Sequence, residues 1–98
     1  MNRYIILESL NFAIYQLEVK FVLKGKTVDS VNTYRNLKNA QRLLRRKREY
    51  DKNVCLVALS MFKEYLENLI HRDDNFKDLS VEMSDKIKGV QCQIDILT

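Results

Sequence analysis

The sequence predicts an all-α protein: a small antiparallel bundle of about four helices, formed by residues 1–98 as a single helical domain. Three observations lead to this prediction. The chain contains no Pro and only 2 Gly, so it offers few of the turns that strand-rich folds need. Apolar residues recur three and four positions apart along the chain, which is the spacing of helices with a buried face. A length of 98 residues fits one domain.

The first helix is expected from about Arg3 to Lys24, and it is apolar on two sides. One seam consists of Leu7, Leu10, Ile14, Leu17 and Phe21. A second strip lies on roughly the opposite side, and its members are Tyr4, Ile5, Phe12, Tyr15, Val19 and Val22. Because both sides must be buried, two hypotheses stay open. Either neighbouring helices clamp this helix between them, or the second strip is an interface with another copy or another protein.

The second helix is expected from about Val28 to Tyr50, after a turn at Gly25 and a cap at Thr27 or Asp29. Its apolar arc consists of Tyr34, Leu37, Ala40 and Leu44. The other face carries five cations that share roughly 100° of arc. We call this set the cationic ridge, and its members are Arg35, Lys38, Arg42, Arg45 and Arg46.

The third helix is expected from about Asn53 to Arg72, with a seam that consists of Cys55, Ala58, Phe62, Tyr65 and Leu69, widened by Leu59, Leu66 and Ile70. On its solvent side, Lys63 and Glu67 have the spacing of an ion pair. The only candidate turn before this helix is "EYDKN", through Asp51 and Asn53. Since the apolar register continues backwards across that stretch, one long bent helix is the alternative.

The fourth helix is expected from about Leu79 to Leu97, after the polar loop "HRDDNFKD" and a cap at Asp78 or Ser80. Its seam consists of Met83, Ile87, Val90, Ile94 and Leu97. Gly89 inside this helix costs about 1 kcal/mol relative to Ala, which suggests that another helix crosses closely there.

Few residues in the sequence have the chemistry of a catalytic or metal site. His71 is the only histidine, and no group of His, Cys or acidic residues has the spacing of a zinc or calcium site. The sequence also lacks a phosphate-binding Gly loop and a nucleophile motif. We therefore expect a protein that is not an enzyme and that has no catalytic residues, no metal and no cofactor. Cys55 has the position of a core residue, whereas Cys92 lies off the seam of its helix.

The N-terminal segment is apolar but resembles neither a signal peptide nor a membrane span, because Glu8, Asn11 and Glu18 interrupt it. Two cysteines are too few for a disulfide framework, which favours a reducing compartment. We expect a cytoplasmic protein that does not bind a membrane.

The cationic ridge is the strongest functional signal in the sequence. The net charge is +4, from 17 basic and 13 acidic residues, which suits an anionic partner without requiring one. Tyr34 and Tyr50 flank the ridge, at positions from which they could stack on bases. The alternatives are an anion-binding surface and a solvated helix face whose long side chains cover apolar neighbours.

Two functions follow from these patterns. The first expectation is a small non-enzymatic interaction protein, such as an inhibitor, adaptor or immunity-type factor. It would dock a helical face on a protein partner, for which an acidic surface suits the ridge, and it would form a homodimer. The alternative is a nucleic-acid-binding regulator that uses the ridge.

Overall fold

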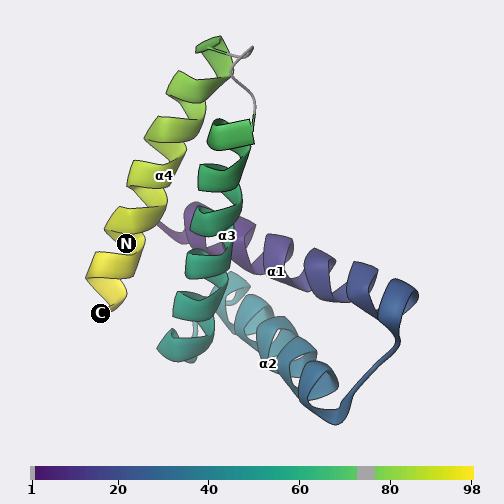
Figure 1. The fold of residues 1–98 in the computed structure, drawn as a ribbon. Coiled ribbons are helices and arrows are strands. Elements are labelled where there is room, and N and C mark those ends of the chain that lie inside the picture. The colour runs from purple at the N-terminus through teal and green to yellow at the C-terminus, as the bar shows by residue number, and fades with distance from the viewer. Residues whose placement is uncertain (1, 73–76) are drawn as a thin grey trace.

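The computed structural model describes residues 2–72 and 77–98, which form four α-helices and no strand (Figure 1). The helices are α1 (Arg3–Lys24), α2 (Val28–Arg45), α3 (Lys52–Arg72) and α4 (Lys77–Leu97). The all-α prediction and the expected order of the helices are therefore confirmed.

Helices α1 and α2 are joined by a turn whose conformation is fixed by local chemistry. Gly25 adopts φ 80° and ψ −174°, a backbone region that essentially only glycine populates. Thr27 then caps α2, because its side-chain oxygen accepts a hydrogen bond from the Ser30 N–H at 3.1 Å. The Ser30 hydroxyl accepts one from the Thr27 N–H at 2.9 Å, which completes a capping box.

Helix α2 ends at Arg45, so the expected extension of this helix to Tyr50 is wrong. The Lys47 N–H donates to the Leu44 carbonyl at 3.2 Å, and the Arg48 N–H donates to the Leu43 carbonyl at 2.9 Å. These two hydrogen bonds form a Schellman motif, which stops a helix when one residue turns left-handed. That residue is Lys47, with φ 57°.

Helix α3 begins after Asp51, whose side-chain oxygen accepts a hydrogen bond from the Asn53 N–H at 2.9 Å. The expected turn at Asp51 therefore forms, and one long bent helix does not. Helix α4 begins at Lys77, two residues earlier than expected, so Asp78 and Ser80 lie inside the helix instead of capping it. Half of the expected loop before it, residues 73–76, lies outside the described residues.

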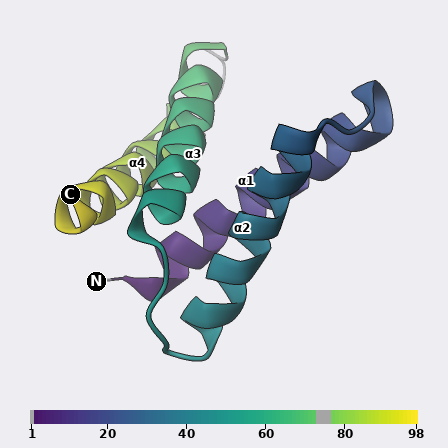
Figure 2. The same ribbon diagram turned by 90° about the horizontal axis from the view of Figure 1, so that it is seen from below.

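The four helices form two antiparallel hairpins, α1–α2 and α3–α4, which cross each other (Figures 1 and 2). Helix α1 contacts each of the other three helices, whereas the described parts of α2 and α4 do not touch each other. The N-terminus is tied to α4, because the Asn2 N–H donates to Oε1 of the buried Gln93 at 2.7 Å. Helix α3 also contacts all three other helices, so α1 and α3 together form the centre of the fold.

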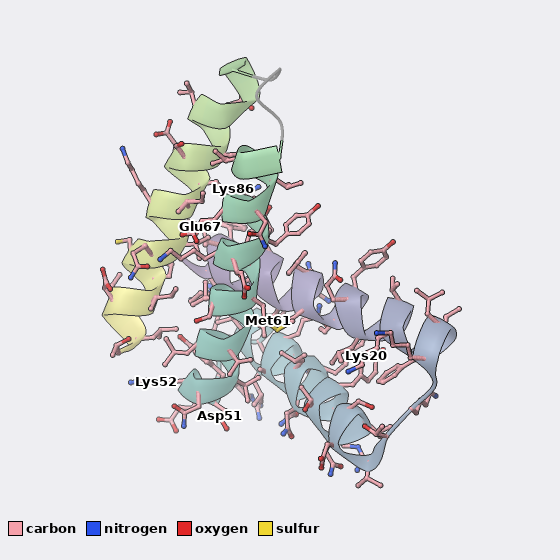
Figure 3. The ribbon with its side chains drawn as sticks, in the orientation of Figure 1. Lys20, Asp51, Lys52, Met61, Glu67 and Lys86 are labelled. Atoms are coloured by element: carbon pink, nitrogen blue, oxygen red, sulfur yellow. The ribbon has the colours of Figure 1, made fainter. Side chains whose placement is uncertain are left out.

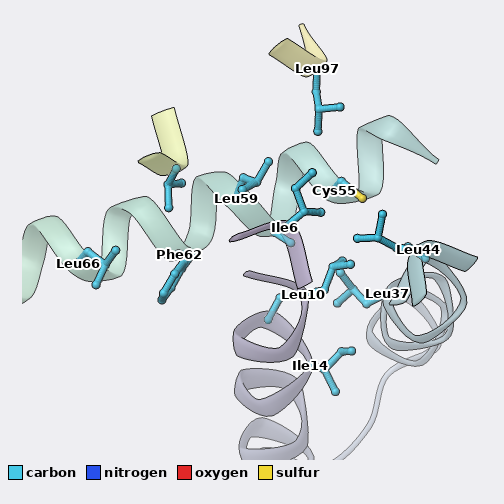
Figure 4. Close-up of a cluster of buried hydrophobic side chains, with 14 residues drawn as sticks. Ile6, Leu10, Ile14, Leu37, Leu44, Cys55, Leu59, Phe62, Leu66 and Leu97 are labelled. Atoms are coloured by element: carbon cyan, nitrogen blue, oxygen red, sulfur yellow. The ribbon is translucent and has the colours of Figure 1, made fainter. Parts of the chain in front are cut away.

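One hydrophobic core forms where the hairpins cross (Figure 4). Its buried apolar members are Ile6, Leu10, Ala13, Ile14, Leu37, Ala40, Leu44, Cys55, Ala58, Leu59, Phe62, Leu66, Val90 and Leu97. Every member of this list that lies in α2 or α3 belongs to the apolar seam expected for that helix. In α1 the core also takes Ile6 and Ala13, together with the buried Ser9, which lie beside the expected seam. All buried residues of α1 fall between Ile6 and Ile14, so residues 15–24 of this helix include no buried residue.

The close helix crossing expected at Gly89 is present between α4 and α1. A Cβ atom at Gly89 would lie 3.0 Å from Cδ1 of Ile5. Gly89→Ala should therefore be nearly neutral for the free energy of unfolding, because a helix-propensity gain of about 1 kcal/mol is offset by this tight contact. In an Ile5→Val background, which lacks Cδ1, the same substitution should stabilise the protein by about 1 kcal/mol. Urea denaturation of the four proteins measures this coupling, and equal effects of Gly89→Ala in both backgrounds would contradict it.

The left-handed Lys47 predicts a stabilising substitution. Lys47→Gly should raise the free energy of unfolding by about 0.5–1 kcal/mol. Glycine avoids the cost of about 1–2 kcal/mol that a left-handed conformation imposes on lysine, but it also increases the conformational entropy of the unfolded chain, which offsets part of the gain. Arg48→Gly is the matched control, since Arg48 does not have a positive φ. Thermal and urea denaturation should show a gain for Lys47→Gly and a loss for Arg48→Gly; a loss for both would refute the explanation.

Candidate partner-binding surface

The cationic ridge lies on the outer face of α2, away from the residues that hold this helix in the core. Leu37, Ala40 and Leu44 are almost fully buried, and they share one side of the helix. All five ridge cations are exposed. Arg46 is the C-cap residue of α2, so the ridge reaches the end of the helix. The burial of the apolar side thus fixes the direction in which the ridge faces.

The ridge has no acidic counterpart among residues 2–72 and 77–98. The ion pairs found there are Lys63–Glu67, at an N–O distance of 3.6 Å, and Lys86–Glu8. The first confirms the expected pair within α3, and the second joins α4 to α1. Since neither pair includes a ridge cation, no described carboxylate lies within ion-pair distance of the ridge.

An open hollow of about 600 Å³ lies on the ridge, lined by Arg35, Asn36, Lys38, Asn39, Gln41 and Arg42. Arg42 donates a hydrogen bond from Nη2 to Oδ1 of Asn39 at 2.7 Å, which orients its guanidinium group. Gln41 donates from Nε2 to Oδ1 of Asn11 on α1. The hollow therefore combines charged donors with carboxamide groups, a set that binds carboxylate or phosphate oxygens.

The two tyrosines that flank the ridge in sequence already have contacts within the protein. The Tyr34 ring packs edge-on against Phe21, with ring centroids 5.5 Å apart, and Nζ of Lys38 lies 5.7 Å from the Tyr34 ring centroid. The Tyr34 hydroxyl donates to Glu18 at 2.9 Å, and this hydrogen bond is the main cause that raises the pKa of Tyr34. Tyr50 is half-buried against the core, and burial raises its pKa.

A second hollow adjoins the ridge, and the sequence pattern did not predict it. It has a volume of about 270 Å³ between α2 and α3, and its lining residues are Thr33, Asn36, Leu37, Asn53, Val54 and Val57. We call it the α2–α3 groove. Asn36 lines both hollows, so the groove and the ridge share a wall. Val54 and Val57 are the residues from which the groove could have been inferred, because they are apolar but lie outside the expected seam of α3. Val57 is 53% exposed.

The second strip of α1 is divided by the fold. Ile5 and Phe12 are half-buried: Ile5 lies against Gly89, and the Phe12 ring packs on Phe62 at a centroid distance of 5.2 Å. Val19 is also half-buried. The remaining members are exposed, and they are Tyr4, Tyr15 and Val22. The structure therefore does not present the six residues as one continuous surface.

The described residues contain no group of three His, Cys, Asp or Glu side chains that could hold a metal ion. The side chain of His71, the one histidine, lies outside the part of the structure that is described. Both cysteines are free thiols: Cys55 is buried and Cys92 is exposed. Burial, and to a smaller extent the charge of Asp51, raises the pKa of the Cys55 thiol to about 11. None of the described helices combines the length and the apolar character needed to cross a membrane.

The two cysteines should differ strongly in reactivity. At pH 8 about one Cys55 thiol in a thousand is ionised, and its side chain has no exposed surface, so it should not react with Ellman's reagent in the folded protein. Exposed Cys92 should react quickly, which gives one reactive thiol in native buffer and two in urea. Cys92→Ser is the control and should be unreactive until unfolded. Two equally fast thiols in the native protein would contradict the buried position of Cys55.

The sequence matches no protein-family model, and searches of curated proteins and of solved structures also found no match.

Proposed function

We propose that the protein is a small non-enzymatic interaction protein, such as an inhibitor, adaptor or immunity-type factor. It docks the outer face of α2 on an acidic protein surface and acts as a homodimer. The observation that carries the proposal is a cationic ridge that forms no ion pair among the described residues and lies beside an apolar groove. A cytoplasmic setting is part of the proposal, supported by the two free thiols.

The position of Arg35 supports a binding role for the ridge. Arg42 and Arg45 lie in the last turn of α2, where cations are stabilised by the helix dipole, so their presence has a structural explanation. Arg35 and Lys38 lie further from the end of the helix, and the dipole effect falls off within the last turn. The helix dipole therefore does not account for their charge, and we propose an external anionic group as their partner.

The α2–α3 groove favours a protein over a nucleic acid. An amphipathic acidic helix can place carboxylates against the ridge and an apolar side chain in the groove beside Leu37 and Val57. A phosphate backbone offers no comparable apolar group. The aromatic stacking that single-stranded nucleic acids use is also less accessible, since Tyr34 contacts Phe21, Lys38 and Glu18.

A nucleic-acid-binding regulator is the second candidate. Four of the five ridge cations are Arg, which forms bidentate contacts with phosphate, and the ridge extends over about 16 Å of helix. Neutralising five phosphates would give affinity that falls about 500-fold between about 50 and 200 mM salt. This steep dependence distinguishes the second candidate from docking on a protein, where the groove adds a contact that salt does not screen.

The proposal is tested with two double variants of equal charge. Arg35→Glu with Arg42→Glu reverses two cations that line the hollow, and Lys52→Glu with Lys88→Glu is the control on α3 and α4, where Figure 3 shows Lys52 at the start of α3. The probes are an acidic amphipathic helical peptide, a polyglutamate peptide of equal charge and a duplex DNA, each followed by fluorescence anisotropy. The amphipathic peptide should bind most tightly, and the ridge variant should weaken it about 30-fold, or about 1 kcal/mol for each reversal. The control should bind within about threefold of the unmodified protein.

Other outcomes assign the surface differently. Tighter binding of DNA, lost in the ridge variant and steeply dependent on salt, would replace the proposal with the second candidate. Equal weakening by both double variants would mean that net charge, and not the ridge, determines binding, which would remove both candidates.

A further inference from the structure

The outer end of the α1–α2 hairpin is only two helices thick. We call residues 15–34 the arm; it includes the end of α1, the turn at Gly25 and the start of α2. In Figures 1 and 2 the arm extends away from α3 and α4. Ser30 is its single buried residue. Helices usually bury their apolar side against more than one neighbour, so the arm lacks a layer that helical bundles normally have.

The arm also exposes large apolar side chains to solvent. Val22 is 85% exposed, Val28 77%, Leu23 75% and Tyr15 62%. Exposed apolar residues scattered singly are ordinary, but these four lie on one projecting element. Figure 3 shows that side chains from the arm extend into open space beyond the crossing, in the region labelled by Lys20. A partner that covers the arm would remove this apolar surface from water.

Contacts within the arm join its two helices to each other. Phe21 and Tyr34 pack across the two helices, and the Tyr34 hydroxyl donates to Glu18. Nζ of Lys26 lies 5.6 Å from the Phe21 ring centroid. The capping box of Thr27 fixes the start of α2. A preformed surface of this kind loses little conformational entropy when it docks.

A hollow of about 350 Å³ lies on the arm, lined by Glu18, Phe21, Val22, Lys26, Val31 and Tyr34. Its apolar residues are accompanied by one acidic and one basic side chain. In a two-fold symmetric dimer both copies contribute the same patch to the interface. Each contact between two different residues therefore occurs twice, with the roles of the two copies exchanged. A patch with one acid and one base is complementary to itself in charge. The cationic ridge is not, because two copies of five cations repel each other.

We propose that a second copy of this chain docks on the arm, so that two α1–α2 hairpins pack into a four-helix unit. Val22 of each copy enters the hollow of the other, and Glu18 of each copy pairs with Lys26 of the other. This inference rests on the homodimer in the proposed function and names its surface. It uses Tyr15 and Val22, the exposed members of the outer half of the second strip of α1, and leaves the half-buried Ile5 and Phe12 in their contacts within one chain.

The test is the oligomeric state, measured by sedimentation equilibrium between about 1 µM and 1 mM, a range that spans weak to moderate dimers. The unmodified protein should dimerise, and Val22→Glu should weaken the dimer at least about 30-fold. Because Val22 is exposed in one chain, this substitution should leave the thermal unfolding of the monomer unchanged. Val81→Glu is the matched control, since Val81 is a 63% exposed valine on α4, and it should leave the dimer constant unchanged.

A charge exchange tests the pairing itself. Glu18→Lys and Lys26→Glu should each weaken the dimer, and the two together should restore it to within about threefold, because both pairs are then re-formed in the opposite sense. A dimer that Val22→Glu leaves intact, or that Val81→Glu breaks, would overturn the arm as the interface while the homodimer stands. A monomeric unmodified protein up to about 1 mM would overturn the homodimer and the arm interface together. Failure to restore the dimer in the double exchange would overturn the Glu18–Lys26 pairing.

Discussion

The crossing of the two hairpins is the constraint on which the remaining structure depends. Near the crossing, α1 carries Ser9 and Ala13 and α3 carries Cys55 and Ala58, all with no exposed surface. Small side chains let helices approach closely, and larger residues of the same cluster, such as Leu59, fill the space beside them (Figure 4). Because the hairpins cross instead of lying parallel, all four helices contribute to one core. The same geometry leaves the arm without a third layer.

The crossing depends in turn on where α2 stops. An α-helix that continued from α2 into α3 would carry α3 away from α1, and the contacts around Leu10 and Leu59 would not form. The chain instead leaves the helix through left-handed Lys47 and enters α3 at Asp51, whose side chain caps it. A left-handed lysine is unfavourable by about 1–2 kcal/mol, which the buried cluster on both sides has to offset. The break in the helix is therefore maintained by tertiary packing more than by local preference.

This dependence explains which features the sequence could predict. The four helices, the turn at Gly25, the burial of Leu37, Ala40 and Leu44 and the exposure of the ridge all follow from local spacing. The end of α2 could not be predicted, because Lys47 has no conformational preference that marks it. Ser9 and Ala13 are too small and too weakly apolar to register in a hydrophobic pattern, although they lie in the core. The α2–α3 groove and the arm depend on how the hairpins cross, which spacing along one chain does not encode.

The same hairpin thus presents two surfaces that differ in charge, and we propose a different partner for each. The five cations of the ridge would repel those of a second copy. The arm, in contrast, has a hollow that is lined by Glu18 and Lys26 together with apolar residues. If the arm holds the dimer together, the ridges of both copies stay available for acidic partners. A dimer with two ridges binds a partner that has two acidic sites more tightly than one ridge can, because the second contact is intramolecular. Dimerisation at the arm would therefore strengthen the binding at the ridge without adding a contact to it.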